Sequence, residues 1–318
     1  MTTPLVSVAI PVFNGMPFLE AAIESVIQQD YTNVEIIISD DGSSDDSRKF
    51  INDISDERTV KLLNQQNAGI FGNLNRCVAR SKGDYIQIMS QDDVMGLGYI
   101  SGQVRSLQMQ PQAGFVYSGC RYIDSKGAFL GDSSADGTPE LIDRATYNWI
   151  ASHYAALPAS ISTVMIPRAT INAIGVFDER YRVAGDIEYW NRISERFAVI
   201  RNPAMQIAIR THINMATMHS KSELAYLSEE AMLTNWYRSL WSPEEYKEIE
   251  RFRMKTRGVD HFQWILRAAL RAQLGDALLG LRLLRNQFAV PEVAIWFLLR
   301  KLRLCSDVRP TLPAPRRL

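Results

Sequence analysis

Short apolar runs alternate with amphipathic segments through the first third of the chain. Runs rich in β-branched residues predict strands at about 5–10, 34–38, 60–63 and 84–89. Helical spacing of apolar residues predicts helices at about 16–29, 44–54 and 71–80. This alternation predicts an α/β fold with a mostly parallel central sheet and helices on both faces.

The alternation is less regular after residue 95. A helix is expected at 98–110, and a second helix begins near Asp186 and buries Ile187, Trp190 and Ile193. Further strands are expected at 115–117, 120–123, 161–166 and 205–209, with a hairpin turn at 124–127 and a mobile loop at 131–139.

From about residue 221 the pattern is helical throughout. Ser242 before Pro243 is a typical helix start, and the segments 261–286 and 291–303 are amphipathic with basic polar faces. We therefore expect one α/β domain at 1–220 and a helical extension at 221–318 that ends in a flexible tail.

Composition narrows the class of protein. The 318 residues are 46% hydrophobic, which supports a sizeable core, and 35 basic residues balance 35 acidic ones. Because the net charge is zero, no overall electrostatic attraction to nucleic acid is expected, and no nucleic-acid partner is expected. The three cysteines lack metal-ligand spacing, and neither a secretory signal nor a spanning apolar segment is present, so a cytoplasmic location is expected.

One predicted strand delivers two adjacent carboxylates. Gly83 opens the apolar run, and Asp92 and Asp93 follow it. In an open α/β sheet the carboxyl ends of strands are where ligands bind, and adjacent carboxylates suit Mg²⁺ or Mn²⁺. A solvated loop that ends the strand is the alternative.

Two common nucleotide-binding motifs are missing. No G-x-G-x-x-G follows the first strand, and no G-x-x-x-x-G-K-[ST] occurs in the sequence. A dinucleotide-binding Rossmann domain and a P-loop enzyme are therefore excluded.

Taken together, the motifs resemble those of the inverting family 2 glycosyltransferases, which have the GT-A fold. The resemblance depends on an ordered set of segments at 6–15, 39–45, 67–69, 83–86, 91–93, 175–178 and 186–192. It covers about the first two-thirds of the chain and implies a nucleotide-sugar donor, a divalent metal (Mn²⁺ or Mg²⁺) and direct displacement at the anomeric carbon. Nucleotide-sugar binding would then lie in 1–95 and the acceptor side in 96–220.

The resemblance also implies a nucleotide site. Its members are Pro11, Phe13, Asn14, Asp40, Asp41, Asn67, Gly69, Asn75, Ser90 and Gln91. Asp40 or Asp41 would accept hydrogen bonds from the base or ribose, and the alternative for this pair is helix capping.

Asp92 matches the last Asp of the family's D-x-D motif and would hold the metal. Ser90 stands where the first Asp is expected, and this removes one negative charge. Asp93 is assigned either to the acceptor side or to a structural role.

Asp186 matches the Asp that acts as general base in the family. The preceding Glu of the family pattern is Gly185 here, Glu188 is the second candidate base, and a helix cap is the alternative role for Asp186.

Basic and aromatic residues complete the implied site. Arg210 and His212 would contact the diphosphate, with a packed histidine as the alternative for His212. Trp149 and His153 lie where acceptor-side residues are expected, although helix packing explains them equally well.

The C-terminal helices leave two possibilities open. They pack as a bundle or form a homodimer, or they bind an anionic membrane surface as peripheral helices on the inner face of the cell membrane. The second possibility favours a lipid-linked glycan acceptor over other glycans. A non-catalytic nucleotide-sugar-binding scaffold remains the alternative to an enzyme, and a nucleotidyltransferase is disfavoured because its Gly-rich N-terminal loop is missing.

Overall fold

A computed structural model of the chain describes residues 3–133, 138, 140–155, 157, 159–212, 215 and 220–304. They fall into two compact units, one within 1–144 and 158–213 and the other within 145–157 and 214–318. The sequence pattern places 145–157 in the α/β domain, whereas their contacts place them in the second unit. The expected tail and most of the expected loop at 131–139 lie outside the described residues.

The strands of the first unit form one sheet in the order β3-β2-β1-β4-β9-β6-β10-β5, with β7 paired to β6 and β8 to β10. Their bounds are β1 Val6–Val12, β2 Val34–Asp40, β3 Thr59–Leu63, β4 Tyr85–Ile88, β5 Val94–Met95, β6 Phe115–Ile123, β7 Phe129–Asp132, β8 Leu141–Ile142, β9 Val164–Pro167 and β10 Val199–Arg210.

Strand β1 lies between two parallel neighbours. Val12 is in register with Asp40 of β2, and Ala9 is in register with Ile88 of β4. β2 continues in parallel to β3, β9 runs antiparallel to β4 and β6, and β6 is parallel to β10. The carboxyl ends of β1, β2 and β4 therefore meet at one edge of the sheet.

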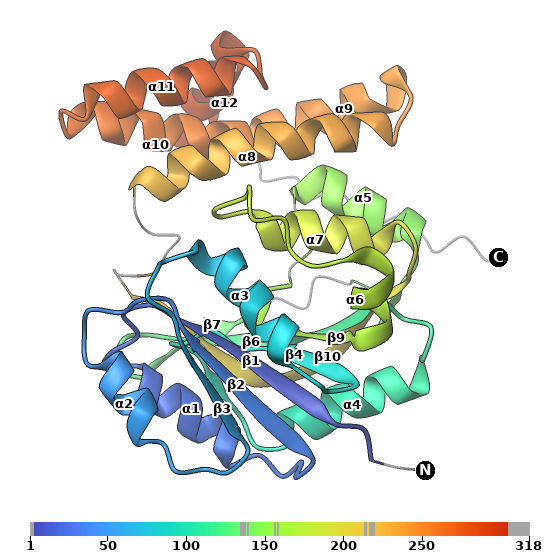
Figure 1. Cartoon of the computed structure of the whole chain (residues 1–318). Helices are drawn as coiled ribbons and strands as arrows, with labels where there is room; N and C mark the ends of the chain where they lie inside the picture. Colours follow the sequence, from blue (N-terminus) through green and yellow to red (C-terminus); the bar gives the residue numbers. More distant parts are fainter. Residues whose placement is uncertain are drawn as a thin grey trace. The chain divides into compact units, whose positions relative to one another are not determined.

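The helices of the first unit lie on both faces of the sheet, as predicted. Figure 1 shows α1, α2 and α4 on one face and α3, α6 and α7 on the other. Their bounds are α1 Leu19–Ile27, α2 Ser47–Asp53, α3 Gly69–Arg80, α4 Tyr99–Met109, α6 Arg168–Ile174 and α7 Gly185–Ser194, with a 3₁₀ turn η1 at Ile161–Thr163. Val8, Ile10 and Ile36 of the sheet pack with Ile23 and Leu107 of the helices in one buried core.

One predicted break in the sheet is wrong. The pattern gives separate strands at 115–117 and 120–123, whereas β6 is continuous from Phe115 to Ile123. Ser118 is buried, and β10 pairs with β6 on both sides of Gly119, with a shift of register between Asn202 and Ile207. Strand pairing therefore overrides the weak strand preference of Ser and Gly.

The second unit is helical. Its helices are α5 Arg144–Tyr154, α8 Ser220–Ser239, α9 Pro243–Arg253, α10 Val259–Leu270, α11 Leu274–Arg285 and α12 Val290–Lys301, with a π-helical segment η3 at Met254–Gly258. Ser242 caps α9 as predicted, because its side chain accepts from the Glu245 N–H and Glu245 reciprocates. Within the described part of the chain, no helix is long and apolar enough to cross a bilayer.

The amphipathic segment at 261–286 is two helices. The chain turns at Ala272, whose φ is 58°, so that α11 folds back on α10. A Cβ on Gly280 would lie 2.9 Å from Trp264 and 3.0 Å from Ile265. This close approach of the two helices buries the apolar face that a single helix would leave exposed.

A buried group of charges ties α8 to the end of α9, η3 and α10. Glu230 has no exposed surface and lies 3.0 Å from Arg253, 3.3 Å from Arg257 and 2.7 Å from His261 Nε2. Burial by itself raises the pKa of Glu230, but the charges of Arg257, His261 and Arg253 outweigh burial and hold the pKa below its usual range.

Glu230→Gln removes the carboxylate and leaves buried guanidinium groups without a counter-charge. We expect the free energy of unfolding to fall by about 3–5 kcal/mol, measured by urea unfolding at neutral pH. The control is Glu250→Gln, which breaks an exposed ion pair with Arg238 and should cost about 1 kcal/mol or less. Equal losses in the two variants would contradict a stabilising role for the buried group.

The same group sets a direction for the pH dependence of stability. Because the folded-state pKa of Glu230 lies below its unfolded value, the stabilisation is present at neutral pH and decreases as the pH falls below about 4.3. The free energy of unfolding of Glu230→Gln should therefore decrease less at acid pH than that of the wild type. The same decrease in both proteins would contradict the assignment.

Candidate active site

Polar residues gather where four strands of the first unit end. Loop 13–15 follows β1, Asp41 follows β2, and Ser90 to Asp93 follow β4. Residues 210–212 end β10 and continue beyond it. The candidate site is the set of contacts among these segments.

The loop after β1 is fixed by Gln91. The Phe13 N–H donates to Gln91 Oε1 at 2.8 Å, and Gln91 Nε2 donates to the Phe13 carbonyl at 3.1 Å. Asn14 has a φ of 50° and accepts the Ser44 N–H through Oδ1 at 2.8 Å. Pro11 lies within β1, whereas the Phe13 side chain is 47% exposed. The loop is therefore rigid and presents an aromatic ring that a ligand can contact.

Asp41 holds the start of α3. Its carboxylate accepts the N–H groups of Ala68 at 2.9 Å and Gly69 at 3.0 Å, and Arg76 Nη1 lies 2.7 Å away. The Asn67 side chain accepts the same Gly69 N–H at 2.9 Å. Asp41 thus serves as a helix cap supplied by a neighbouring strand.

Asp40 shapes the turn after β2. It is completely buried and accepts the N–H groups of Gly42 and Ser43, both at 3.3 Å, with Arg48 at 3.9 Å. Asp41 thus caps α3 rather than the helix that follows it in the sequence, and Asp40 accepts from the turn before α2 without capping a helix. A direct bond from either one to a nucleotide stays a prediction.

Asn75 connects α3 to the loop before α7. Its Nδ2 donates to the Phe177 carbonyl at 2.9 Å and to Glu179 at 2.8 Å, while its Oδ1 accepts the Phe177 N–H at 3.0 Å. The amide groups of Asn75 are thus engaged with the protein. The predicted contact of Asn75 with a nucleotide stays a prediction.

Asp92 and His212 face each other across the sheet edge. Asp92 Oδ2 lies 2.9 Å from His212 Nε2, although 120 residues separate them in the sequence. The His212 side chain is 10% exposed and that of Asp92 is 19% exposed. His212 Nδ1 is buried without a hydrogen-bond partner among the described residues. The fold therefore joins two residues that the sequence assigned to one site.

Asp93 points into the protein. Ser162 Oγ lies 2.5 Å from Asp93 Oδ2, and the Arg210 N–H donates to Oδ1 at 2.9 Å. Burial and the neighbouring Asp92 carboxylate raise the pKa of Asp93 to about 7. Ser162 Oγ also lies 2.9 Å from Ser90 Oγ and accepts the Ser90 N–H at 3.0 Å. These contacts agree with the structural role that was the alternative to an acceptor-side role for Asp93.

Arg210 supports the backbone around Asp92. Its Nε donates to the Asp92 carbonyl at 2.9 Å, Nη1 donates to the Asp124 carbonyl at 3.2 Å, and the residue is 7% exposed. The Phe18 ring lies 4.9 Å from its guanidinium carbon and 4.5 Å from the His212 ring. Arg210 is therefore placed to position Asp92.

Asp186 lies in the first turn of α7, and its Oδ1 accepts the Ile187 N–H at 2.8 Å. A Cβ on the preceding Gly185 would lie 2.6 Å from the Phe71 ring. Phe71 belongs to the first turn of α3, the same turn that Asp41 caps. This packing fixes the start of α7 against the start of α3.

Glu188 is committed to an ion pair. Arg192 Nη2 lies 2.8 Å from Glu188 Oε2, and Arg192 also donates to the carbonyls of Ile174 and Val176. Glu188 therefore fixes the loop before α7, and its role as the second candidate base stays a prediction.

Trp149 and His153 lie in the second unit. Their rings stack 4.1 Å apart, and His153 contacts Phe252 with ring centroids 5.6 Å apart. Burial also lowers the pKa of His153. Helix packing accounts for both residues.

Comparison with known proteins agrees with this arrangement. Residues 7–134 match the family model described as Glycosyl transferase family 2. A protein named as an uncharacterized glycosyltransferase in Rickettsia prowazekii is 29% identical over 243 residues, which cover 76% of this chain and 71% of that protein. Over residues 7–134 the chain is therefore similar to the family 2 glycosyltransferases. The resemblance found in the sequence is thus confirmed.

Two further proteins are similar to this glycosyltransferase. UDP-Glc:alpha-D-GlcNAc-diphosphoundecaprenol beta-1,3-glucosyltransferase WfaP of Escherichia coli is 36% identical over 114 residues, 36% of this chain and 45% of that protein. The structure of mannosyltransferase PcManGT from Pyrobaculum calidifontis, in complex with GDP-Man and Mn²⁺, has a TM-score of 0.56 at 17% identity, covering 96% of this chain and 81% of that chain. The GT-A fold is confirmed.

The residues of the glycosyltransferase fit a divalent metal shared with a substrate. The described residues contain no group of three or more metal-ligating side chains. Asp92 and His212 nevertheless place a carboxylate and an imidazole 2.9 Å apart, both partly accessible. Mg²⁺ and related ions are commonly held by one or two protein ligands together with substrate phosphates and water. The donor set therefore suits a metal that binds together with a diphosphate.

Three residues of the site escape sequence reasoning. Ser162 joins Ser90 to Asp93, Arg76 pairs with Asp41, and Phe18 packs on His212. None belongs to the segments that carry the family resemblance, and each is an ordinary residue type for its segment. Only the approach of distant segments in the fold reveals their roles.

Gly185→Ala tests the packing that fixes the start of α7 in the glycosyltransferase. The added Cβ would meet three atoms of the Phe71 ring at 2.6–2.9 Å, and we expect a loss of about 1–3 kcal/mol in the free energy of unfolding. The matched control is Gly275→Ala in α11, where nothing lies within 4 Å and stability should hold or rise. A double variant with Phe71→Leu should recover part of the loss. Additive losses in that urea-unfolding cycle would contradict the contact.

Proposed function

We propose that this protein moves a sugar from a nucleotide-diphosphate sugar to an acceptor hydroxyl, with inversion at the anomeric carbon. The observation that carries the proposal is the contact of Asp92 with His212 at the edge where β1, β2 and β4 end. Ligands of open α/β sheets bind at this edge. The rigid loop at Phe13 and Asn14 lies at the same edge and offers a surface for the nucleoside.

UDP is the proposed nucleotide of the donor. The support is the WfaP relative, whose name states UDP-Glc as its substrate. In this chain the Asp41 carboxylate caps α3, and the Gln91 side chain hydrogen-bonds the Phe13 backbone. These contacts fix the two loops that would line the nucleoside. Fixed loops favour binding because little conformational freedom is left to lose.

Asp92 and His212 would hold the metal, and Mn²⁺ or Mg²⁺ would offset the charge that builds on the departing diphosphate. Arg210 positions the Asp92 backbone, and the buried contact of Ser162 with Asp93 stabilises the loop after β4. Ser90 contributes no charge to this site, so two side chains of the protein would carry the metal.

Asp186 is the proposed general base. The acceptor oxygen attacks the anomeric carbon, the bond from that carbon to the diphosphate oxygen breaks, and the hydroxyl proton passes to Asp186. A carboxylate in the first turn of a helix is electrostatically favoured in its charged form, which is the form a base requires. The Phe71 contact with Gly185 holds this turn beside α3.

The proposed acceptor is a lipid-linked glycan in the synthesis of a surface polysaccharide. The named acceptor of WfaP is a diphosphoundecaprenol-linked sugar. We propose that the protein acts in the cytoplasm at the inner face of the membrane, where such an acceptor would be reached.

A non-catalytic nucleotide-sugar-binding protein is the second candidate. Ser90 and Gly185 favour it, because each replaces a carboxylate of the family pattern. Nucleotide binding without transfer or donor hydrolysis would select this candidate.

Asp186→Asn removes the base and keeps the shape of the side chain. We expect transfer to fall by about 10²–10⁴-fold, while UDP affinity stays within about twofold. Product formation from a radiolabelled donor measures the first quantity, and calorimetric titration measures the second. Glu188→Gln is the matched control, since Glu188 lies in the same turn but pairs with Arg192, and it should keep most of the activity. Retained transfer in Asp186→Asn would remove the base assignment.

Asp92→Ala tests the metal assignment. Calorimetric titration with UDP, GDP, CDP and dTDP, each with Mn²⁺ or with EDTA, should show selective binding that needs the metal. The variant should lower this affinity about tenfold or more, because half of the proposed protein ligand set is lost. Asp132→Ala, which removes a surface carboxylate paired with Arg121, should leave binding unchanged. Equal metal dependence in wild type and Asp92→Ala would exclude the assignment.

A further inference from the structure

Helix α11 carries a row of exposed leucines. Leu274, Leu278 and Leu281 follow one another at helical spacing and are 62%, 69% and 37% exposed. The helix buries a different row, Ala277, Gly280 and Leu284, against the rest of its unit. The exposed row is therefore additional to the face that α11 needs for packing.

Helix α12 carries a similar row. Ile295, Leu298 and Leu302 are 55%, 57% and 64% exposed, whereas Val293 is fully buried. Leu299 lies next to them on the helix surface, four residues after Ile295 and three before Leu302. Two consecutive helices of one unit thus expose large apolar side chains at regular positions.

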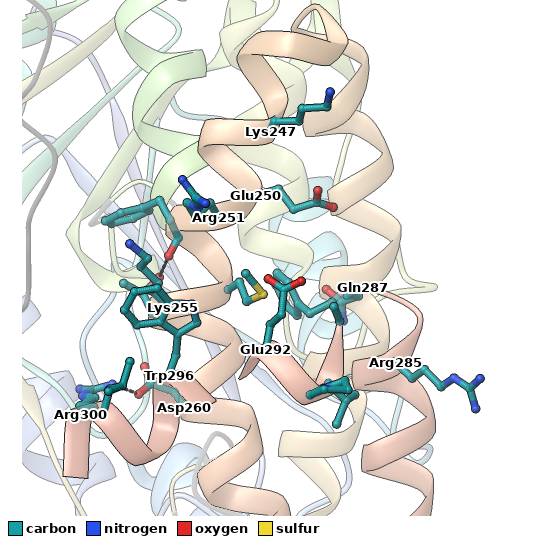
Figure 2. Close-up of a pocket in the computed structure, with 18 of the residues that line it drawn as sticks. Lys247, Glu250, Arg251, Lys255, Asp260, Arg285, Gln287, Glu292, Trp296 and Arg300 are labelled. Atoms are coloured by element: carbon teal, nitrogen blue, oxygen red, sulfur yellow. Dashed lines mark hydrogen bonds and ion pairs between the residues drawn. The ribbon is translucent and has the colours of Figure 1, made fainter. Parts of the chain in front are cut away.

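A groove of about 2010 Å³ borders both helices. Leu281 and Arg285 of α11 line it, and so do Leu299 and Arg300 of α12. Figure 2 shows Trp296 and Arg300 on one wall, with the Arg285 side chain extending away from the groove. We call the two rows, together with the groove that both helices line, the α11–α12 surface.

The charge around this surface is mainly positive. Residues 259–304 contain seven arginines and lysines against three carboxylates, Asp260, Asp276 and Glu292. Of these, Asp260 already pairs with Arg300 at 2.8 Å, and Lys255 lies 4.1 Å from the centre of the Trp296 ring. The exposed leucines lie among arginines and lysines that outnumber the carboxylates. A complementary partner would therefore offer an apolar layer for the leucines and negative charges at its surface for the basic side chains.

We propose that the α11–α12 surface docks on an anionic lipid bilayer. Leucines would enter the boundary between head groups and acyl chains, while Arg282, Arg285 and Lys301 would meet the lipid phosphates. A second copy of the chain is a poorer partner, because two such surfaces would bring like charges together. The purpose of the docking rests on the proposed function, since it would bring the transferase to a lipid-linked acceptor.

Vesicle flotation of the full chain tests this docking. The protein should float with vesicles of phosphatidylcholine mixed with phosphatidylglycerol and remain behind with phosphatidylcholine alone, and added salt should weaken binding. The double variant Leu278→Glu, Leu298→Glu should lower the partition about tenfold or more. Arg282→Gln with Arg285→Gln should remove the preference for the anionic vesicles.

The control introduces glutamate at an exposed apolar residue of the first unit. Met109 is 74% exposed at the end of α4, and Met109→Glu should float like the wild type. All substituted positions are exposed or border the groove, and circular dichroism checks that each variant is folded. Absence of flotation, equal flotation in the leucine variant, or a dimer in sedimentation that the leucine variant dissociates would overturn the proposal.

These outcomes are separable from failure of the proposed function. UDP binding without vesicles depends on Asp92 and the first unit, and it should be unchanged in every variant of the α11–α12 surface. Wild-type flotation that is lost in the leucine variant, with UDP binding intact in both proteins, would confirm the docking surface. Wild-type flotation without UDP binding or transfer would support the docking surface and contradict the proposed enzymatic function.

Discussion

The parallel pairing of β1 with both β2 and β4 is the constraint on which the candidate site depends. It sets Val12 level with Asp40 and Ala9 level with Ile88, so that three strands end at one edge. Polar loops can extend from this edge because backbone groups of the strands are already paired in the sheet. The two hydrogen bonds between the Gln91 side chain and the Phe13 backbone then connect the loop after β4 to the loop after β1.

Most polar groups of the site act on the protein itself. Asp41 caps α3, Asn75 ties down the loop at Phe177, and Arg210 holds the backbone at Asp92. Asp92 and His212 differ from these groups because they contact each other from distant segments, next to the buried pair of Ser162 and Asp93. Such preorganisation is what catalysis by charge stabilisation requires.

Two departures from the family pattern have local physical reasons. An alanine or larger residue at Gly185 would overlap the Phe71 ring, so the fold requires glycine at this point. At position 90 a carboxylate would bring a further negative charge to Ser162, whose Oγ already lies 2.5 Å from the buried Asp93. The pKa of Asp93 is raised by burial and by Asp92, and another neighbouring charge would be unfavourable.

Local sequence patterns were enough to predict the alternating strands and helices, the sheet edge at which Asp40, Asp41 and Asp92 lie, and the change to a helical region. These follow from local periodicity and turn chemistry, which depend on neighbouring residues. The continuity of β6, the folding back of α11 on α10, and the contacts of Ser162 and Phe18 with the site residues are visible only in the folded chain. The same holds for the contacts that Asn75 and Glu188 make within the protein. Each of these outcomes depends on groups far apart in the chain that compete for the same hydrogen bonds and packing space, and such competition leaves no local pattern in a sequence.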